Sequence, residues 1–412
     1  MQRAAPIDPS GTLKTYHAGT HRTISPEATL ARARPFMGEM GITRIANVTG
    51  LDDIGVPVVM VCRPNSRSVS VAQGKGIDLA AAKASGLMEA IETYHAEHIL
   101  QPLKLASTCE LRETEDLIDI ERLPRSIDSR YHPDLPLLWI EGRNLINDRT
   151  LWLPYELVHT DYTLPAPTGS GCFPANTNGL ASGNHILEAM THGICEVVER
   201  DALTLWRLAP SSLSKRRLDL GNADDPTSSA LLERLKQAGL DVTVWDATSD
   251  VGIACFHCLL MGRDDQVEPE FGAGCHPTRE VALLRAITEA VQARTTYIAG
   301  SRDDFAPDIY QEQARTLRVQ ACRNLLAQEA HLQAFQDVPS FKSDRLDSDL
   351  DWTLQRLQSV GIDQVVAVDL TKDKYQIPVA RMVIPGLEGV YKGAESDYTP
   401  GPRARALIEP NR

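Results

Sequence analysis

Two segments of the sequence place carboxylates where one face of an α-helix would gather them. In "SGLMEAIETYHAEH", residues 85–98, Glu89 and Glu92 stand three positions apart among apolar residues. Further along the chain, "GICEVVERDALTLW" repeats the arrangement with Glu196 and Glu199. One such pair is ordinary, but two pairs in similar helices indicate a ligand that is held by negative charge on the protein.

These carboxylates belong to lines of polar residues with a spacing of i, i+4 and i+7, which follows one face of a helix. The three lines are Ser85, Glu89 and Glu92; His192, Glu196 and Glu199; and Arg285, Glu289 and Gln292. Glu188 stands about three turns before Glu199 and therefore points near the second line. The remaining faces are rich in Ala, Leu, Ile and Val, so we expect the helices to pack closely and turn their polar lines toward a common cavity.

A cluster of this kind has a specific chemistry. Like charges held together in a partly buried site raise one another's pKa, so the cluster needs cations. Oxygen ligands favour Mg²⁺ or Ca²⁺ over zinc, and Mg²⁺ commonly joins carboxylates to nucleotide phosphates. Arg200, Arg285 and Arg294 offer guanidinium groups that suit phosphate oxygens. The pattern predicts a metal-nucleotide site; the alternative is three solvated helix faces with local Glu/Arg pairs.

Neither of the common nucleotide-binding loops is found. "VAQGKG" lacks the glycine spacing of a P-loop, and no Ser or Thr follows Lys75. "TGSGCFPAN" fails the Gly-x-Gly-x-x-Gly spacing of dinucleotide-binding loops. "QGKG" is either a turn that faces phosphate or a tight connection into the next helix.

The bulk composition restricts the class of protein. With 412 residues, a net charge of −13 and a pI near 5.4, the chain lacks the broad basic face that nucleic-acid binding needs. It has no signal-peptide pattern and no run of eighteen apolar residues, so we expect a soluble, cytoplasmic protein. The eight cysteines are scattered, which favours free thiols over a disulfide framework.

The order of predicted elements favours an α/β fold. Residues 1–12 read as a flexible tail, and "VPVVMVC" reads as a buried strand. We expect three long helices, each after a strand or a glycine-rich loop: one in "VSVAQGKGIDLAAAKASGLMEAIETYHAEHI", one from about residue 185 to 208 and one in "TREVALLRAITEAVQARTTYIAG". "DQVVAVDL" and "IPVARMVIPG" read as late strands. We see no linker that divides residues 13–412.

Four segments together resemble the YcaO family of ATP-dependent enzymes, over roughly residues 60–390. They are "QGKGIDLAAAKASGLMEAIETYH", "NTNGLASGNHILEAMTHGICEVVERDAL", "LLRAITEAVQAR" and "IPVARMVIPGLE". The resemblance implies a YcaO-type α/β fold with mixed sheets and long Ala-rich helices converging on MgATP. The metal ligands that it implies are Glu89, Glu92, Glu196, Glu199 and Glu289. The ATP contacts that it implies are Ser85, Asn184, Glu188, Arg200 and Arg285, with Arg22 as a further candidate.

The resemblance also implies a reaction. A nucleophile adds to a peptide backbone amide, and the resulting oxyanion takes the γ-phosphoryl group of ATP. Azoline-forming members typically end in a Pro-x-Pro-x-Pro tail, whereas this sequence ends "PGPRARALIEPNR". "TYHAGTHRTISPEATLARARP" and "VPVVMVCRPNSRSVSVAQGKG" are similar to the TfuA-associated branch, which is linked with thioamide formation.

The leading hypothesis is therefore a peptide thioamide synthetase that works with a TfuA-like sulfur-delivery protein, as a homodimer. The alternatives within the family are azoline or amidine formation. An alternative of another class is a non-catalytic nucleotide-binding accessory protein in sulfur transfer.

Several histidines and cysteines have two interpretations. Cys255 and Cys258 form a Cys-x-x-Cys that either relays sulfur or lies in an ordinary strand, and the strand pattern of "GIACFHCLLMG" favours the second. Cys172 either faces substrate or is a loop residue without a role. His95, His98 and His192 are candidate bases, because an imidazole titrates near neutral pH.

Overall fold

The computed structural model describes residues 12–209, 215–223, 225–263, 267–302, 304–390 and 398–408. The tail predicted over residues 1–12 lies outside this part except for Thr12, which is buried and whose carbonyl oxygen accepts a hydrogen bond from the Leu346 amide. No helix in the described part is long and apolar enough to cross a membrane.

A small antiparallel sheet and the first carboxylate helix form the N-terminal part. The elements are α1 (Pro26–Ala33), β1 (Arg44–Asn47), β2 (Val58–Cys62), β3 (Val71–Lys75) and α2 (Leu79–Glu97). The strand order is β1-β2-β3. Asp78 caps α2 by accepting from the Ala81 amide, so the turn after Lys75 leads directly into this helix.

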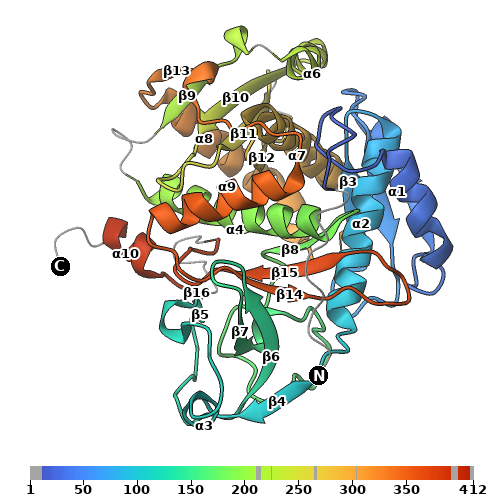
Figure 1. Cartoon of the computed structure of the whole chain (residues 1–412). Coiled ribbons are helices and arrows are strands. Elements are labelled where there is room, and N and C mark those ends of the chain that lie inside the picture. The colour runs from blue at the N-terminus through green and yellow to red at the C-terminus, as the bar shows by residue number, and fades with distance from the viewer. Residues whose placement is uncertain are drawn as a thin grey trace.

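A six-stranded sheet lies below the second carboxylate helix, α4 (Ile186–Leu208) (Figure 1). Its order is β4-β6-β14-β15-β8, with β7 paired to β6. The strands are β4 (Leu103–Ala106), β6 (Leu137–Asn144), β7 (Arg149–Pro154), β8 (Leu180–Ser182), β14 (Val366–Asp369) and β15 (Val379–Val383). At its periphery lie α3 (Thr108–Arg112), α10 (Pro402–Ile408) and a two-stranded pair, β5 (Arg125–Ser126) and β16 (Tyr398–Thr399).

A five-stranded sheet lies on the other side of α4 and carries the third carboxylate helix, α7 (Arg279–Ala299) (Figure 1). Its order is β12-β11-β10-β9-β13, in which the β13–β9 pair is parallel and the others are antiparallel. The strands are β9 (Arg216–Asp219), β10 (Leu240–Asp246), β11 (Cys255–Gly262), β12 (Glu270–Cys275) and β13 (Leu332–Ala334). The other helices are α6 (Pro226–Gln237), α8 (Glu312–Ala327) and α9 (Leu346–Ser359).

The sheets that precede α2 and α7 have the same local arrangement of hairpin and helix. In each, an antiparallel hairpin (β2–β3 or β11–β12) ends in a short turn, and the helix returns across the last strand. Glycines permit this close approach: a Cβ on Gly74 would stand 2.0 Å from the Ala82 carbonyl oxygen, and one on Gly272 would stand 2.2 Å from the Ala290 amide. The approach brings the polar lines of α2 and α7 to the ends of their sheets.

We expect Gly74→Ala to destabilise the protein by about 2–3 kcal/mol, because backbone on both sides must move to admit the methyl group. Gly38→Ala is the matched control, since nothing lies within 4 Å of its added Cβ. Urea denaturation of both variants measures the difference. Equal midpoints for Gly74→Ala and wild type would contradict the tight packing of β3 on α2.

Candidate functional site

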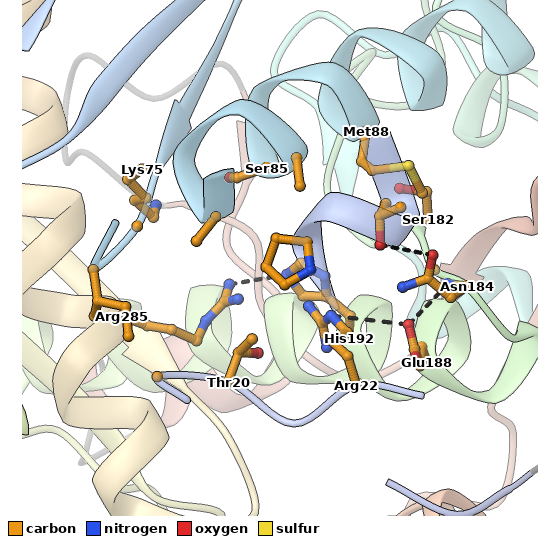
Figure 2. A pocket seen from close by; sticks show the side chains of 18 of the residues that line it. Thr20, Arg22, Lys75, Ser85, Met88, Ser182, Asn184, Glu188, His192 and Arg285 are labelled. Atoms are coloured by element: carbon orange, nitrogen blue, oxygen red, sulfur yellow. Dashed lines mark hydrogen bonds and ion pairs between the residues drawn. The ribbon is translucent and has the colours of Figure 1, made fainter. Parts of the chain in front are cut away.

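A cavity opens where α2, α4 and α7 meet the segment that precedes α1. It encloses about 970 Å³, including the solvent at its mouth. Its lining includes Arg22, Lys75, Ser85, Glu92, Asn184, Glu188, His192 and Arg285. Figure 2 shows these side chains converging from separate elements, with Ser85 and Met88 on one wall and His192 and Glu188 on the opposite wall. The structure therefore brings together five of the six residues predicted to contact ATP, namely all except Arg200.

The polar lines occupy the half-buried positions of otherwise buried helices. Ser85, Glu89 and Glu92 are partly exposed on α2, while their neighbours Ala84, Gly86 and Ala90 are buried. His192 and Glu196 on α4 and Arg285 and Glu289 on α7 follow the same pattern. The amphipathic reading of the three helices is correct, and their polar sides face an interior cavity instead of bulk solvent.

Cationic groups gather at one end of this cavity. Arg285 donates from Nη2 to His192 Nε2 at 2.9 Å, and its buried Nε has no hydrogen-bond partner among the described residues. The sequence left open whether Lys75 faces phosphate or lies in a tight connection. In the structure Lys75 lines the cavity, and its Nζ lies 2.7 Å from Glu289 Oε2. A guanidinium with a free donor beside an ammonium is an arrangement suited to phosphate oxygens.

Glu188 fastens the N-terminal segment over the cavity. Glu188 is 2% exposed, and its Oε1 accepts from the backbone amide and hydroxyl of Thr23 at 2.6 and 2.8 Å. Oε2 accepts from the backbone N–H of Asn184 at 2.8 Å and lies 3.8 Å from Arg22 Nε (Figure 2). Glu188 therefore places Arg22 beside Asn184, and both of its oxygens are already engaged by protein groups.

The carboxylates of α2 have strongly perturbed acidity. Burial raises the pKa of Glu89 to about 7, an effect that Lys75 opposes. Burial raises the pKa of Glu92 to about 8, the hydrogen bonds from Ser182 oppose the rise, and the charge of Glu89 adds to it. Glu92 Oε1 accepts from the backbone amide and hydroxyl of Ser182 at 2.8 and 2.7 Å. Both groups are costly to ionise without a neighbouring cation.

The carboxylates of α4 and α7 share the cations that are present. Arg200 lies 3.7 Å from an oxygen of Glu196 and 3.7 Å from an oxygen of Glu199. Burial raises the pKa of Glu199, and the negative charge of Glu289 adds to this rise. Burial also acts to raise the pKa of Glu289, but Lys75 and Arg200 outweigh it and hold that pKa below its ordinary value. The five predicted metal ligands are thus within electrostatic range of one another.

The donor set fits Mg²⁺, although the side chains are not arranged as a closed metal site. Within the described ranges, no group of three or more His, Cys, Asp or Glu side chains stands ready to hold a metal ion. Instead Glu289 pairs with Lys75, Glu92 accepts from Ser182, and Arg200 lies between Glu196 and Glu199. An oxygen-only set in which the pKa of Glu89, Glu92, Glu196 and Glu199 is raised by burial is the chemistry that a hard divalent cation stabilises.

Arg294 does not belong to the site, contrary to the suggestion that it neutralises phosphate. Its Nε lies 2.7 Å from Asp52 Oδ2, and it is absent from the lining of the cavity. Arg294 stands nine residues beyond Arg285, so its side chain leaves α7 on a different side. The ion pair with Asp52 ties α7 to the loop that precedes β2.

The candidate cysteines are buried in the protein core. Cys255 and Cys258 are fully buried in β11, which confirms the strand interpretation, and burial raises the pKa of the Cys258 thiol. Cys172 is 1% exposed and packs in the core with Phe173.

The candidate histidines differ in position. His95 is buried and His98 stacks on Tyr94, and neither lines the cavity. Burial and the positive charge of Arg285 lower the pKa of His192, so at neutral pH it acts as a neutral acceptor.

A second cavity lies on the other side of the acidic cluster. It encloses about 1120 Å³, again including solvent, and lies between α4, β15 and the loop before β8. Glu196 and Arg200 line it, together with Arg381 of β15. The acidic cluster therefore stands between two cavities, a division that helical periodicity could not show. Arg381 is a single charged residue in the otherwise apolar strand "VARMV", and this is the feature of the sequence that could have indicated the second cavity.

Comparison with known proteins decides the family. Residues 73–388, well over half of the chain, match the family model described as YcaO cyclodehydratase, ATP- and Mg²⁺-binding. A protein in the tfuA 3′ region of Rhizobium leguminosarum bv. trifolii is 37% identical over 92% of both chains. The chain belongs to the YcaO family. The predicted cofactors, ATP and Mg²⁺, are confirmed by this membership.

Two solved YcaO-type structures share the fold. YcaO from Methanopyrus kandleri, bound with AMPPCP and Mg²⁺, has a TM-score of 0.74 and 22% identity over 95% of this chain and 100% of that one. A heterocyclase in complex with substrate and cofactor has a TM-score of 0.77 and 23% identity over 94% of this chain and 56% of that one. These likenesses confirm the predicted YcaO-type α/β fold with mixed sheets.

The raised pKa values of the YcaO carboxylates predict a pH-dependent response to Mg²⁺. Burial raises the pKa of Glu92 from an ordinary value of 4.5 to about 8 in the folded protein, so without a cation the protein loses stability as the pH rises between these two values. A bound cation removes the loss, and each proton that it displaces changes its apparent affinity about tenfold per pH unit.

We therefore expect Mg²⁺ to raise the melting temperature more at pH 8 than at pH 6, as measured by differential scanning fluorimetry. Glu92→Gln is the control, because it removes the carboxylate with the highest raised pKa and should flatten the dependence. A larger Mg²⁺ effect at pH 6 than at pH 8 would contradict the assignment.

Proposed function

We propose that this YcaO protein converts a peptide backbone amide into a thioamide, using MgATP and a sulfide equivalent delivered by a TfuA-like partner. The observation that carries the proposal is the 37% identical relative in a tfuA 3′ region, which spans 92% of both chains. The nucleotide would occupy the cavity between α2, α4 and α7, with its phosphates toward Arg285 and Lys75. The five glutamates would hold Mg²⁺ against those phosphates.

The reaction balances without an oxidant or reductant. The sulfur of hydrogen sulfide bonds to the amide carbon, and the former carbonyl oxygen takes the γ-phosphoryl group of ATP. The carbon–oxygen bond then breaks, and inorganic phosphate carries away the amide oxygen as the C=S bond forms. The overall change is amide, hydrogen sulfide and ATP to thioamide, ADP and phosphate. Phosphorylation is needed because an oxyanion is a poor leaving group.

This chain's own groups have defined tasks in that reaction. Arg22, Lys75 and Arg285 would neutralise phosphate oxygens, and Ser85 and Asn184 would donate hydrogen bonds to the nucleotide. Glu188 would act through Arg22 and Asn184, since its own oxygens are engaged. Mg²⁺, when bound, offsets the charge that develops during phosphoryl transfer. Arg200, held between Glu196 and Glu199, would face the transferred group from the second cavity.

The test uses the purified protein, its TfuA-like neighbour, MgATP, sulfide and a peptide whose target amide carries heavy oxygen. We expect a mass gain of about 14 Da per amide, because sulfur replaces the heavy oxygen, and heavy oxygen in the released phosphate. No ATP turnover with any peptide or sulfur source would overturn the proposal. Phosphate without heavy oxygen would show that ATP is hydrolysed by water and would overturn the mechanism.

Azoline formation is the second candidate, because the matching family model is described as a cyclodehydratase. Here a Cys, Ser or Thr side chain of the substrate is the nucleophile. The same assay separates the two, since cyclodehydration removes about 20 Da, one water that contains the heavy oxygen, and does not depend on sulfide.

A further inference from the structure

The second cavity, between α4, β15 and the loop 174–178, has the polar groups of a binding site. Arg381 is 2% exposed in a strand whose other residues are apolar. Its Nη2 donates to the Asn176 carbonyl oxygen at 2.8 Å, but Nε and Nη1 have no hydrogen-bond partner among the described residues. No carboxylate in the described part of the chain forms an ion pair with it. A buried guanidinium with unpaired N–H donors costs free energy unless a ligand supplies the acceptors.

The same cavity also holds an acceptor without a donor. Asn178 lines it, and its buried Oδ1 has no partner among the described residues. Arg381 of β15 therefore brings unpaired N–H donors, and Asn178 of the adjacent loop brings an unpaired oxygen acceptor, to the wall of this cavity. The remaining wall is largely apolar, formed by Leu123, Pro124, Leu157, Met382 and Leu387.

This combination selects for the chemistry of the occupant. An anion would satisfy Arg381 but would be repelled by the amide oxygen of Asn178 and by Glu196, which lines the same cavity. A cation would be repelled by Arg200 and Arg381. A backbone amide is neutral and offers one carbonyl acceptor and one N–H donor, which matches both free groups.

The position of the cavity agrees with this occupant. Glu196 and Arg200 form part of its lining, whereas Arg285, Lys75 and Ser85 line the proposed nucleotide cavity on the other side of the acidic cluster. A peptide in the second cavity would approach the cluster from the side opposite the nucleotide. That approach suits transfer of a phosphoryl group from one ligand to the other, for which the reacting atoms must lie roughly in line.

We propose that this cavity binds the substrate's backbone amide, with the amide carbonyl accepting from Arg381 and the amide N–H donating to Asn178. The proposal rests on the proposed function, because it specifies where the peptide of that reaction lies.

Retention of peptides by the protein tests the assignment. The probe is a pool of capped synthetic pentapeptides, and the protein is loaded with MgAMPPNP; retained peptides are identified by mass spectrometry. We expect wild type to retain a subset and Arg381→Met and Asn178→Leu to lower that retention at least about tenfold, the loss of one or two buried hydrogen bonds. Asn178→Leu is included because it removes a group that has no partner at its oxygen.

Thr177→Ala is the matched control, since Thr177 lines the same cavity but is exposed, and its retention should equal that of wild type. MgAMPPNP affinity, measured on all four proteins, should stay within about twofold, which separates peptide binding from a folding defect. Undiminished retention by both Arg381→Met and Asn178→Leu would overturn the cavity assignment alone. Failure of wild type to retain any peptide would overturn it together with the proposed function.

Discussion

Glu199→Gln should lower peptide-dependent ATP turnover by about a thousandfold, equivalent to about 4 kcal/mol of transition-state stabilisation. The substitution keeps the shape of a side chain that is 3% exposed but removes its charge. The substitution would remove one of the proposed Mg²⁺ ligands, and Arg200 is left with Glu196 as its remaining close carboxylate on α4. Steady-state phosphate release at saturating peptide and MgATP measures the effect.

The same substitution should not reduce the stability of the metal-free protein. Burial raises the pKa of Glu199, so its ionised form is the destabilising one, and the neutral amide resembles the protonated form. We therefore expect an unchanged or higher melting temperature at pH 8 alongside the loss of turnover. Glu312→Gln, on the exposed face of α8, is the control and should keep full activity. Full activity of Glu199→Gln would remove this residue from the metal site.

Helical periodicity predicted the carboxylate lines because that signal is local. Ser85, Glu89 and Glu92 share a face whatever the helix packs against, and the face is half-buried as expected. The spacing could not show that the polar faces divide two cavities, because that depends on how three sheets bring the helices together. For the same reason Arg294 was misplaced: it is near Arg285 in sequence, but Asp52, more than two hundred residues away, holds it.

The roles of residues with distant partners have no local pattern from which they could be predicted. Lys75 was undecided between a phosphate-facing turn and a connection, and its ion pair with Glu289 joins groups 214 positions apart. Arg381 lies within the segment "IPVARMVIPGLE", but a single Arg in a strand has no periodic pattern that would mark it as functional. Its significance arises from unpartnered donors in a buried cavity, which only three-dimensional placement reveals.

The resemblance to the YcaO family, and not the residue spacing, specified ATP. Carboxylate lines at helical spacing are compatible with any hard divalent cation. The nucleophile is a separate question, because sulfide would come from a partner protein. Its use would therefore require no particular side chain of this chain that could be recognised in the sequence. The thioamide assignment therefore depends on the relative beside tfuA and on the heavy-oxygen experiment, whereas the phosphate contacts can be tested on this chain alone.

Arg285→Ala should weaken MgAMPPNP binding about a hundredfold, and Arg285→Lys about tenfold. Arg285 lines the proposed nucleotide cavity, donates to His192 and has a buried Nε without a partner among the described residues. A guanidinium forms two parallel hydrogen bonds to phosphate oxygens, whereas an ammonium acts as a point charge, so Lys restores part of the affinity. Isothermal titration calorimetry with MgAMPPNP and with MgADP measures both losses and shows whether the γ-phosphate accounts for the difference.

Arg294→Lys on the same helix is the matched control. Its partner is Asp52, outside the cavity, and the substituted ammonium preserves that ion pair. Arg285→Lys and Arg294→Lys both replace a guanidinium on α7 with an ammonium. A loss of affinity that is confined to position 285 therefore cannot come from a general effect on the helix. Equal affinity of wild type and Arg285→Ala would mean that phosphate is held elsewhere. The remaining cations on the lining, Arg22 and Lys75, would then have to carry the phosphate charge without Arg285.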